Sequence, residues 1–532
     1  MIKNLYILAI GGSGEHILKP FLLSLAAGMP INAECVIPVF LDNDADGRNA
    51  ELKECKELIT NYRKLREYFV NNCNNVPVPK IAKIKLAEPI YLNVNGGNIQ
   101  TLGQILKHPT LTASLTDREK ELNASLFTER DLLFNTQDLS LNLNVGFVGN
   151  PNIGSVVLNS QCLILEQFNV ILEASEDDAV LVLGSLFGGT GAAGIPLIIN
   201  KLNRDAAEHK PYLGCIAMTP YFNVAEQTND EDADELGVDQ SYKIVSSTFE
   251  PKTRAALMYY DQYMCNLDSM YYVGDSKRPT YKNKRGQQHN PTHLCEFIAA
   301  MGIYDFARHV THVEDSSEIA YLLPKWGFIK SSDCRRSNID CVIEKDAWEA
   351  LVRFSIMQQM FLQEDILRKD IRDQIPYVRD FAITEEIIES VIGARRSYAW
   401  AKPLSDIFKS WDNWRIQLSE GWLENINLPH RTEPQRPFSW IKSGNVSANE
   451  VLTLFYSTRN GEGYGLAQTE TIHHIFREDE TKVKSAMLRN RLNAAYSSLN
   501  LTNKNNYTNE QKLAILLSVI SSMLDSMINE II

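Results

Sequence analysis

The stretch LGSLFGGTGAAGIP, residues 183–196, places five glycines and one threonine between two apolar runs. Glycine has no Cβ, so such a stretch either bends freely or lets another group approach the backbone closely. The residues before it, Val180–Gly184, are typical of a strand buried on both faces, and Ala192–Leu202 have a helical pattern. The sequence therefore predicts a strand, a tight turn and a helix, whose N-terminal N–H groups favour an anion.

A second glycine cluster has the same context near the N-terminus. It follows the apolar run Leu5–Ile10 and consists of Gly11, Gly12, Ser13 and Gly14. A helical pattern follows it, but Pro20 lies inside that pattern and should kink the helix or delay its start. Two such turns on adjacent strands could hold one polyphosphate between them.

Short apolar runs and helical patterns alternate up to about residue 300. The predicted strands are Leu5–Ile10, Val36–Leu41, Val180–Gly184, Leu213–Met218 and Met270–Val273, and the predicted helices between them are Glu51–Phe69, Ser155–Glu173 and Ala192–Leu202. This alternation is typical of an α/β protein with a Rossmann-like, mostly parallel sheet, which binds ligands beyond the carboxyl ends of its strands.

The second half of the chain has mainly helical patterns, so we predict one domain at 1–310 and a helical domain at 311–532. Its last helix is predicted to begin at Thr508, with Gln511 completing a capping box. The apolar residues of that helix either pack inside the protein or form a partner or self-association surface.

Composition narrows the class of protein. A net charge of −13 makes a nucleic-acid partner unlikely, because neutralising phosphates needs an excess of Lys and Arg. Nine cysteines without a C-x-x-C pair favour reduced thiols and a cytoplasmic location. No apolar run is long enough for a membrane span.

One hypothesis for the first turn is a dinucleotide site. Asp42 ends the second predicted strand, where an acidic residue could hold a ribose hydroxyl. The third glycine of G-x-G-x-x-G, however, would fall at Ile17, which is bulky. A dinucleotide fold also has no need of a second glycine-rich phosphate turn so far along the chain.

Several segments together resemble the tubulin/FtsZ superfamily of GTP-binding proteins. GGTGAAG, residues 188–194, resembles its signature G-G-G-T-G-[ST]-G, although Phe187 stands where the first glycine would be. In the family's order, IGGSG (10–14), LDNDAD (41–46) and GFVGNPNIGS (146–155) resemble its first three phosphate loops. MTPYFNVAE (218–226) is similar to its ribose loop, and QQHNPTHLCEFIAAMGIYDF (287–306) to the start of its core helix.

The resemblance covers about residues 1–310 and implies a site for GTP or GDP with magnesium. The implied phosphate contacts are Gly11, Gly12, Ser13, Gly14, Gly149, Asn150, Gly188, Gly189, Thr190 and Gly191. The implied acidic loop holds Asp42, Asn43 and Asp44, with Asp44 as the magnesium ligand, because this ion prefers oxygen. Glu226 is the implied ribose contact, and Asn290 or His293 the implied base contact.

The family's behaviour further implies self-assembly or partner binding controlled by the nucleotide. Hydrolysis in the family is completed by an acidic motif N-x-D-x-x-D/E after the core helix. The corresponding stretch here, ARHVTHVEDSSE (307–318), has acids but lacks that asparagine and spacing. Whether the chain is a GTPase is therefore left open, and the alternatives are a non-polymerising nucleotide-binding scaffold or a Rossmann-type dinucleotide enzyme.

Overall fold

A parallel β-sheet forms the centre of the molecule. The computed structural model describes residues 1–42, 50–73, 75–92, 101–105, 133–141, 143, 147, 149–160, 168–205, 210–225, 245–263, 267–274, 278–281, 290–309, 350–351, 353–354, 357–358, 401–425, 442–443, 446–447, 481–501 and 507–531. The strands of the main sheet are β1 (Ile2–Ile10), β2 (Ala33–Leu41), β3 (Lys85–Leu86), β4 (Ile90–Leu92), β5 (Ala179–Ser185), β6 (Tyr212–Met218) and β8 (Ser269–Val273).

The strand order is β3-β2-β1-β5-β6-β8, with β4 also beside β2, and every pair in this sheet is parallel. All five strands predicted from apolar runs are present, and each extends beyond its predicted bounds. The predicted α/β class with a mostly parallel sheet is therefore confirmed. A separate pair, β7 (Asn223–Val224) and β9 (Thr280–Tyr281), is also parallel.

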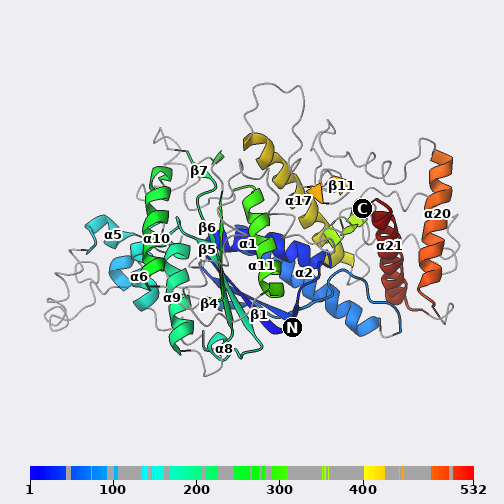
Figure 1. Ribbon diagram of the computed structural model, residues 1–532, viewed down its shortest axis with the longest axis horizontal. Coiled ribbons are helices and arrows are strands. Elements are labelled where there is room, and N and C mark those ends of the chain that lie inside the picture. The colour runs from blue at the N-terminus through cyan, green and yellow to red at the C-terminus, as the bar shows by residue number, and fades with distance from the viewer. Residues whose placement is uncertain are drawn as a thin grey trace.

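Helices cover both faces of the sheet (Figure 1). One face carries α1 (Gly11–Ala26), α2 (Ala50–Asn72) and α11 (Leu294–His309), and the other carries α6 (Pro151–Ser160), α9 (Thr190–Asp205) and α10 (Phe249–Tyr263). Successive residues of β1 face opposite sides of the sheet. Ile7 therefore belongs to the cluster on the α1 side, which we call the first hydrophobic cluster, and Leu8 to the one on the α9 side, the second hydrophobic cluster. Shorter helices are α3 (Leu102–Ile105), α5 (Thr136–Ser140), α8 (Asn169–Leu172) and a 3-10 turn at Ser246–Thr248.

Two helix predictions need correction. Pro20 does not delay the first helix, because α1 begins at Gly11 directly after β1 and continues through the proline to Ala26. Most of α1 is buried, and this packing supports the helix across the lost hydrogen bond. The helix predicted at 155–173 begins earlier, at Pro151; α6 is described to Ser160, residues 161–167 lie outside the described residues, and α8 covers Asn169–Leu172.

The described part of the C-terminal half packs through its helices on α1 and α2. It contains α17 (Ala401–Asn425), α20 (Thr481–Ser498), α21 (Asn509–Ile531) and the hairpin strands β10 (Lys442–Ser443) and β11 (Val446–Ser447). Trp411 and Trp414 of α17 belong to the same hydrophobic cluster as α1 and α2. The boundary at 310 stays a prediction, as does the helical character of the segments outside the described residues.

The start of the last helix is as predicted. The Thr508 N–H donates to Gln511 Oε1 at 3.1 Å, and the Gln511 N–H donates to Thr508 Oγ1 at 3.3 Å. The apolar side chains between Leu513 and Leu524 are buried in the first hydrophobic cluster, so this part of α21 packs inside the protein.

Two further predictions concern the environment of the chain. Within the described ranges, no helix combines the length and apolar character needed to cross a bilayer. The cysteines with free thiols in those ranges are all buried: Cys35, Cys55, Cys73, Cys215 and Cys295. The cytoplasmic location stays a prediction.

Candidate functional site

The two glycine turns lie side by side at the centre of the sheet. Strands β1 and β5 are neighbours, and strand order reverses between them. The first turn follows β1 at Gly11, and the second follows β5 after Ser185. Open α/β sheets bind ligands beyond the carboxyl ends of the strands at such a reversal. The structure thus brings the two turns together at the position where a ligand is expected.

Contact between the turns is direct. Gly11 has a φ of +63°, and a Cβ built on it would lie 3.0 Å from Thr190 Cβ in the second turn. A Cβ on Gly14 would lie 2.8 Å from both the carbonyl carbon of Ala9 and the carbonyl oxygen of Leu183. These two glycines therefore allow the close approach of α1 to β1, β5 and the second turn.

Gly12 differs from its neighbours because its Cβ position faces open space. No heavy atom lies within 4 Å of a Cβ built there. The helix N-cap, Ile10, offers no side-chain acceptor to the first N–H groups of α1. Helix N-terminal N–H groups without a side-chain cap bind water or an anion. This corner of the first turn therefore has both the room and the polarity for a phosphate group.

Glycine in the second turn is required by packing within the protein. A Cβ on Gly189 would lie 2.9 Å from Phe147 Cβ and 3.1 Å from the Asn150 nitrogen. A Cβ on Gly191 would lie 2.6 Å from the Ser185 nitrogen, and one on Gly188 would lie 2.7 Å from Ser185 Oγ. The resemblance implied that these residues are glycine so that phosphate can approach the backbone. In the structure, neighbouring protein atoms already occupy the space that a Cβ would need.

The third segment, around Gly149, is held against the second turn. Gly149 has a φ of +70°, and its carbonyl accepts a hydrogen bond of 2.6 Å from Lys252 Nζ of α10. Burial lowers the pKa of Lys252. The Asn150 carbonyl accepts from the Gly154 N–H at 3.1 Å, near the start of α6. Lys252 was missed by sequence analysis, because its contact joins residues about a hundred positions apart.

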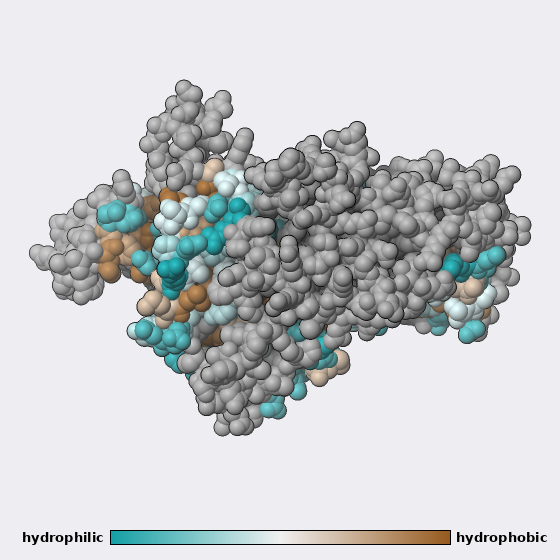
Figure 2. All heavy atoms as spheres, turned by 45° about the horizontal axis from the view of Figure 1, so that its top comes forward, coloured by the Kyte–Doolittle hydropathy of each residue, from teal (hydrophilic) through white to brown (hydrophobic). Residues whose placement is uncertain are grey.

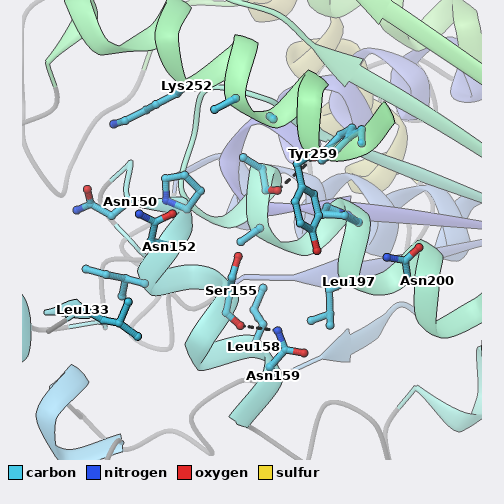
Figure 3. Close-up of a pocket in the computed structure, with 18 of the residues that line it drawn as sticks. Leu133, Asn150, Asn152, Ser155, Leu158, Asn159, Leu197, Asn200, Lys252 and Tyr259 are labelled. Carbon is cyan, nitrogen blue, oxygen red and sulfur yellow. Dashed lines mark hydrogen bonds between the residues drawn. The ribbon is translucent and has the colours of Figure 1, made fainter. Parts of the chain in front are cut away.

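A cavity of about 1000 Å³ opens beside this third segment. Its walls come from α6, α9 and α10, and Figure 3 shows Ser155, Leu197 and Tyr259 facing a common space. Asn150 and Lys252 line one end of it. Hydrophilic (teal) and hydrophobic (brown) side chains lie next to one another at the left of Figure 2, the end of the molecule that carries α6, α9 and α10 in Figure 1. The third segment therefore lies between the glycine turns and the cavity.

The implied base contacts lie just before α11 and are buried. The His293 N–H donates to Glu296 Oε2 at 2.9 Å, and His293 Nδ1 accepts from the Cys295 N–H at 3.1 Å. His293 therefore caps α11, in a capping-box arrangement. Its ring lies 5.2 Å from that of Tyr221, which follows β6, and Asn290 is also buried. The imidazole thus has a structural role at this helix start.

An aromatic cluster connects this base-side segment to the second turn. The Phe187 ring lies 6.1 Å from Tyr221, 5.6 Å from Phe222 and 4.8 Å from Phe249 at the start of α10. Phe187 is buried. The residue that departs from the glycine signature therefore anchors the second turn to two neighbouring segments.

Three of the implied site residues lie outside the described residues: Asn43, Asp44 and Glu226. Asp42 is half-buried and directly follows β2. Within the described ranges, no group of three or more His, Cys, Asp or Glu side chains is placed to hold a metal ion. The magnesium ligand therefore stays a prediction.

Comparison with known proteins gave no match to any family model, any curated protein or any solved structure. The likeness to the tubulin/FtsZ superfamily accordingly rests on the sequence segments alone.

Proposed function

We propose that this chain is a GTP-binding protein of the tubulin/FtsZ type. GTP or GDP is held between the two glycine-rich turns, and Asp44 holds magnesium, with Asp42 and Asn43 beside it. The bound nucleotide controls self-assembly or the binding of a protein partner. The observation that carries this proposal is the contact between Gly11 and Thr190, which joins two anion-favouring turns at the reversal of strand order.

Three features of the site support a polyphosphate ligand. The open space at Gly12 leaves room beside the first N–H groups of α1. The second turn leads into α9, whose N-terminus adds a second positive helix end. The third segment packs on Gly189, so three loops converge on one place. A single phosphate would need only one of these turns, whereas a di- or triphosphate spans two.

A Rossmann-type dinucleotide enzyme is the second candidate, because the strand order also fits that class. Against it, Ile17 stands at the third glycine position and is fully buried in the hydrophobic cluster. The close helix–strand approach is made at Gly14 instead. The second glycine turn has no role in that mechanism, so GTP remains the better proposal.

Thermal unfolding of the full chain with GTP, ATP or NAD, each with magnesium, tests this proposal. A ligand at about 100 times its dissociation constant stabilises the folded state by about 2.7 kcal/mol. We expect stabilisation by GTP, and stabilisation by NAD alone would refute the proposal. Sedimentation with and without GTP then separates a filament former from a static scaffold. Phosphate release measures whether the chain hydrolyses GTP.

A further inference from the structure

A cluster of polar side chains lies on the α1 side of the sheet, and all of them are buried except His16, which is partly exposed. We call it the ionic junction, and its members are His16, Lys19, Glu51, Tyr221 and Glu296. His16 and Lys19 come from α1, Glu51 from the first turn of α2, Tyr221 from the segment after β6, and Glu296 from the first turn of α11. The four contributing segments are those that carry or adjoin the implied nucleotide contacts.

Direct contacts connect the members of the ionic junction. Glu296 Oε1 lies 3.3 Å from His16 Nδ1 and accepts a hydrogen bond of 2.8 Å from the Tyr221 hydroxyl. On the other side of the imidazole, His16 Nε2 lies 3.9 Å from Glu51 Oε1. Glu51 Oε2 lies 3.6 Å from Lys19 Nζ, which also pairs with Glu54. His16 therefore links the carboxylates of α2 and α11.

The charge state of His16 follows from these neighbours. Burial by itself would lower the pKa of His16, but the carboxylates of Glu51 and Glu296 outweigh this effect and raise the pKa to about 9. His16 is therefore a cation at neutral pH. The titratable groups around it are Glu15 and Lys19 on α1, Glu51, Glu54 and Cys55 on α2, Tyr221, and Glu296 on α11.

Stability alone gives little reason for such a cluster. Buried ion pairs lose much of their attraction to desolvation, and apolar residues of similar volume often stabilise a protein equally well. Ion pairs do, however, specify geometry, because a buried charge is costly whenever its partner moves away. The ionic junction is thus suited to fixing the relative positions of the segments that contribute to it.

Short chain distances connect the junction to the proposed site. His16 lies two residues after Gly14, so a shift of His16 moves the first glycine turn. Glu296 accepts from the backbone of His293, the implied base contact. Tyr221 packs against both His293 and Phe187, and Phe187 belongs to the second turn. The junction therefore contacts the phosphate side and the base side at once.

We propose that His16, Glu51 and Glu296 are positioning residues of this site, and that binding of Mg-GTP requires His16 in its charged form. The inference rests on the proposed function, because it assigns these residues to the same nucleotide site. A charged His16 holds α2 and α11 against α1 and thereby fixes the relative positions of the first glycine turn and the base-side segment. Neutral His16 releases both carboxylates, which then repel each other.

Two variants and a matched control test this inference. His16→Gln removes the charge, and Tyr221→Phe removes one hydrogen bond to Glu296 while keeping the ring. The control is Tyr271→Phe, which removes a part-buried tyrosine–carboxylate hydrogen bond, to Asp305 near the other end of α11. We expect both test variants to bind Mg-GTP about tenfold more weakly than the control, a factor equal to 1.4 kcal/mol.

The pH dependence gives a readout that a purely structural role would not move. Wild-type affinity for Mg-GTP, measured by calorimetry between about pH 7 and about pH 10, should fall as pH rises through the pKa of His16. His16→Gln should bind weakly and lose less affinity over this range, because only the guanine base, which itself gives up a proton there, still titrates. Unchanged affinity in both folded variants would overturn the inference. If His16→Gln does not fold, Tyr221→Phe decides alone.

Amide hydrogen exchange in nucleotide-free protein separates this inference from the proposed function. We expect faster exchange across the first glycine turn and the start of α11 in both test variants, but not in Tyr271→Phe. If wild-type protein binds no GTP, the proposed function fails, and so does the binding part of the inference. The exchange result still tests whether the junction positions these segments, and equal exchange in all variants would refute that.

Discussion

The most direct test of the glycine turns is the substitution Gly12→Ala. The Cβ of this residue would meet no heavy atom of the protein within 4 Å, and its φ is not in the left-handed region. The new methyl group therefore costs the folded protein nothing through contact. It would, however, occupy the space beside the first N–H groups of α1, where the proposed phosphate lies.

The expected effects on stability and on binding have opposite signs. Alanine inside a helix is more stable than glycine by about 0.5–1 kcal/mol, so Gly12→Ala should keep or raise the free energy of unfolding. Affinity for GTP should fall at least about tenfold, because the methyl group holds the phosphate away from its N–H donors. Gly12→Val should weaken binding further, since its side chain fills more of the same space.

Gly14→Ala provides the contrast. Its Cβ would lie 2.8 Å from backbone atoms of both Ala9 and Leu183, which cannot move aside as a side chain can. Overpacking of this kind costs about 1–3 kcal/mol. Gly14→Ala should therefore lower stability, whereas Gly12→Ala should not.

Chemical denaturation measures the free energy of unfolding of each variant, and calorimetric titration with Mg-GTP measures affinity. The proposal requires that Gly12→Ala lower the affinity for GTP without lowering the free energy of unfolding. If Gly12→Ala binds GTP as tightly as wild type, the open corner at Gly12 does not receive the phosphate. If Gly12→Ala is as unstable as Gly14→Ala, the geometry of α1 described above is wrong.

Three further predictions concern stability. The pKa of His16 is about 9 in the folded protein and 6.5 in its ordinary state, so protonated His16 stabilises the folded state by roughly 3 kcal/mol. This stabilisation is complete below pH 6.5 and is lost as pH rises through 9, and urea denaturation should show the loss in wild type and not in His16→Gln. Lys252→Met removes the donor to the Gly149 carbonyl and should cost about 1 kcal/mol by the same assay, with a cost of zero contradicting the contact. Phe187→Ala empties a buried aromatic site and should lower the free energy of unfolding by about 3–5 kcal/mol, and a loss below that of Lys252→Met would contradict the anchoring role.

Much of the central sheet could be predicted from sequence because its strands are buried on both faces. Val180–Gly184 and Leu213–Met218 are continuous apolar runs, and a glycine-rich turn directly after the first marks where that strand ends. The start of α1 could not be predicted, because the penalty for Pro20 is offset by tertiary packing that local sequence does not contain.

The contacts that hold the site together also could not be predicted from local sequence patterns. Glu296 was predicted only as part of a helix, yet it contacts α1 and the segment after β6. Ser185 lies just beyond the predicted strand and was given no role, yet its backbone atoms set the need for glycine at Gly191. Such contacts join segments distant in sequence, and one sequence gives periodicity along the chain but not contacts across it.

Phe187, which replaces the first glycine of the family signature, has a packing role. This role bears on how the proposed nucleotide site would be coupled to the cavity. A glycine at position 187 would leave the second turn without its ring contacts to Phe222 and to Phe249, the first residue of α10. The third segment makes another such connection, because it packs on Gly189 and is held by Lys252 of the same helix. Helix α10 is therefore tied to both loops and also forms a wall of the cavity. If nucleotide binding shifts α10 through either loop, a partner bound in that cavity would change nucleotide affinity by the same factor that the nucleotide changes affinity for the partner.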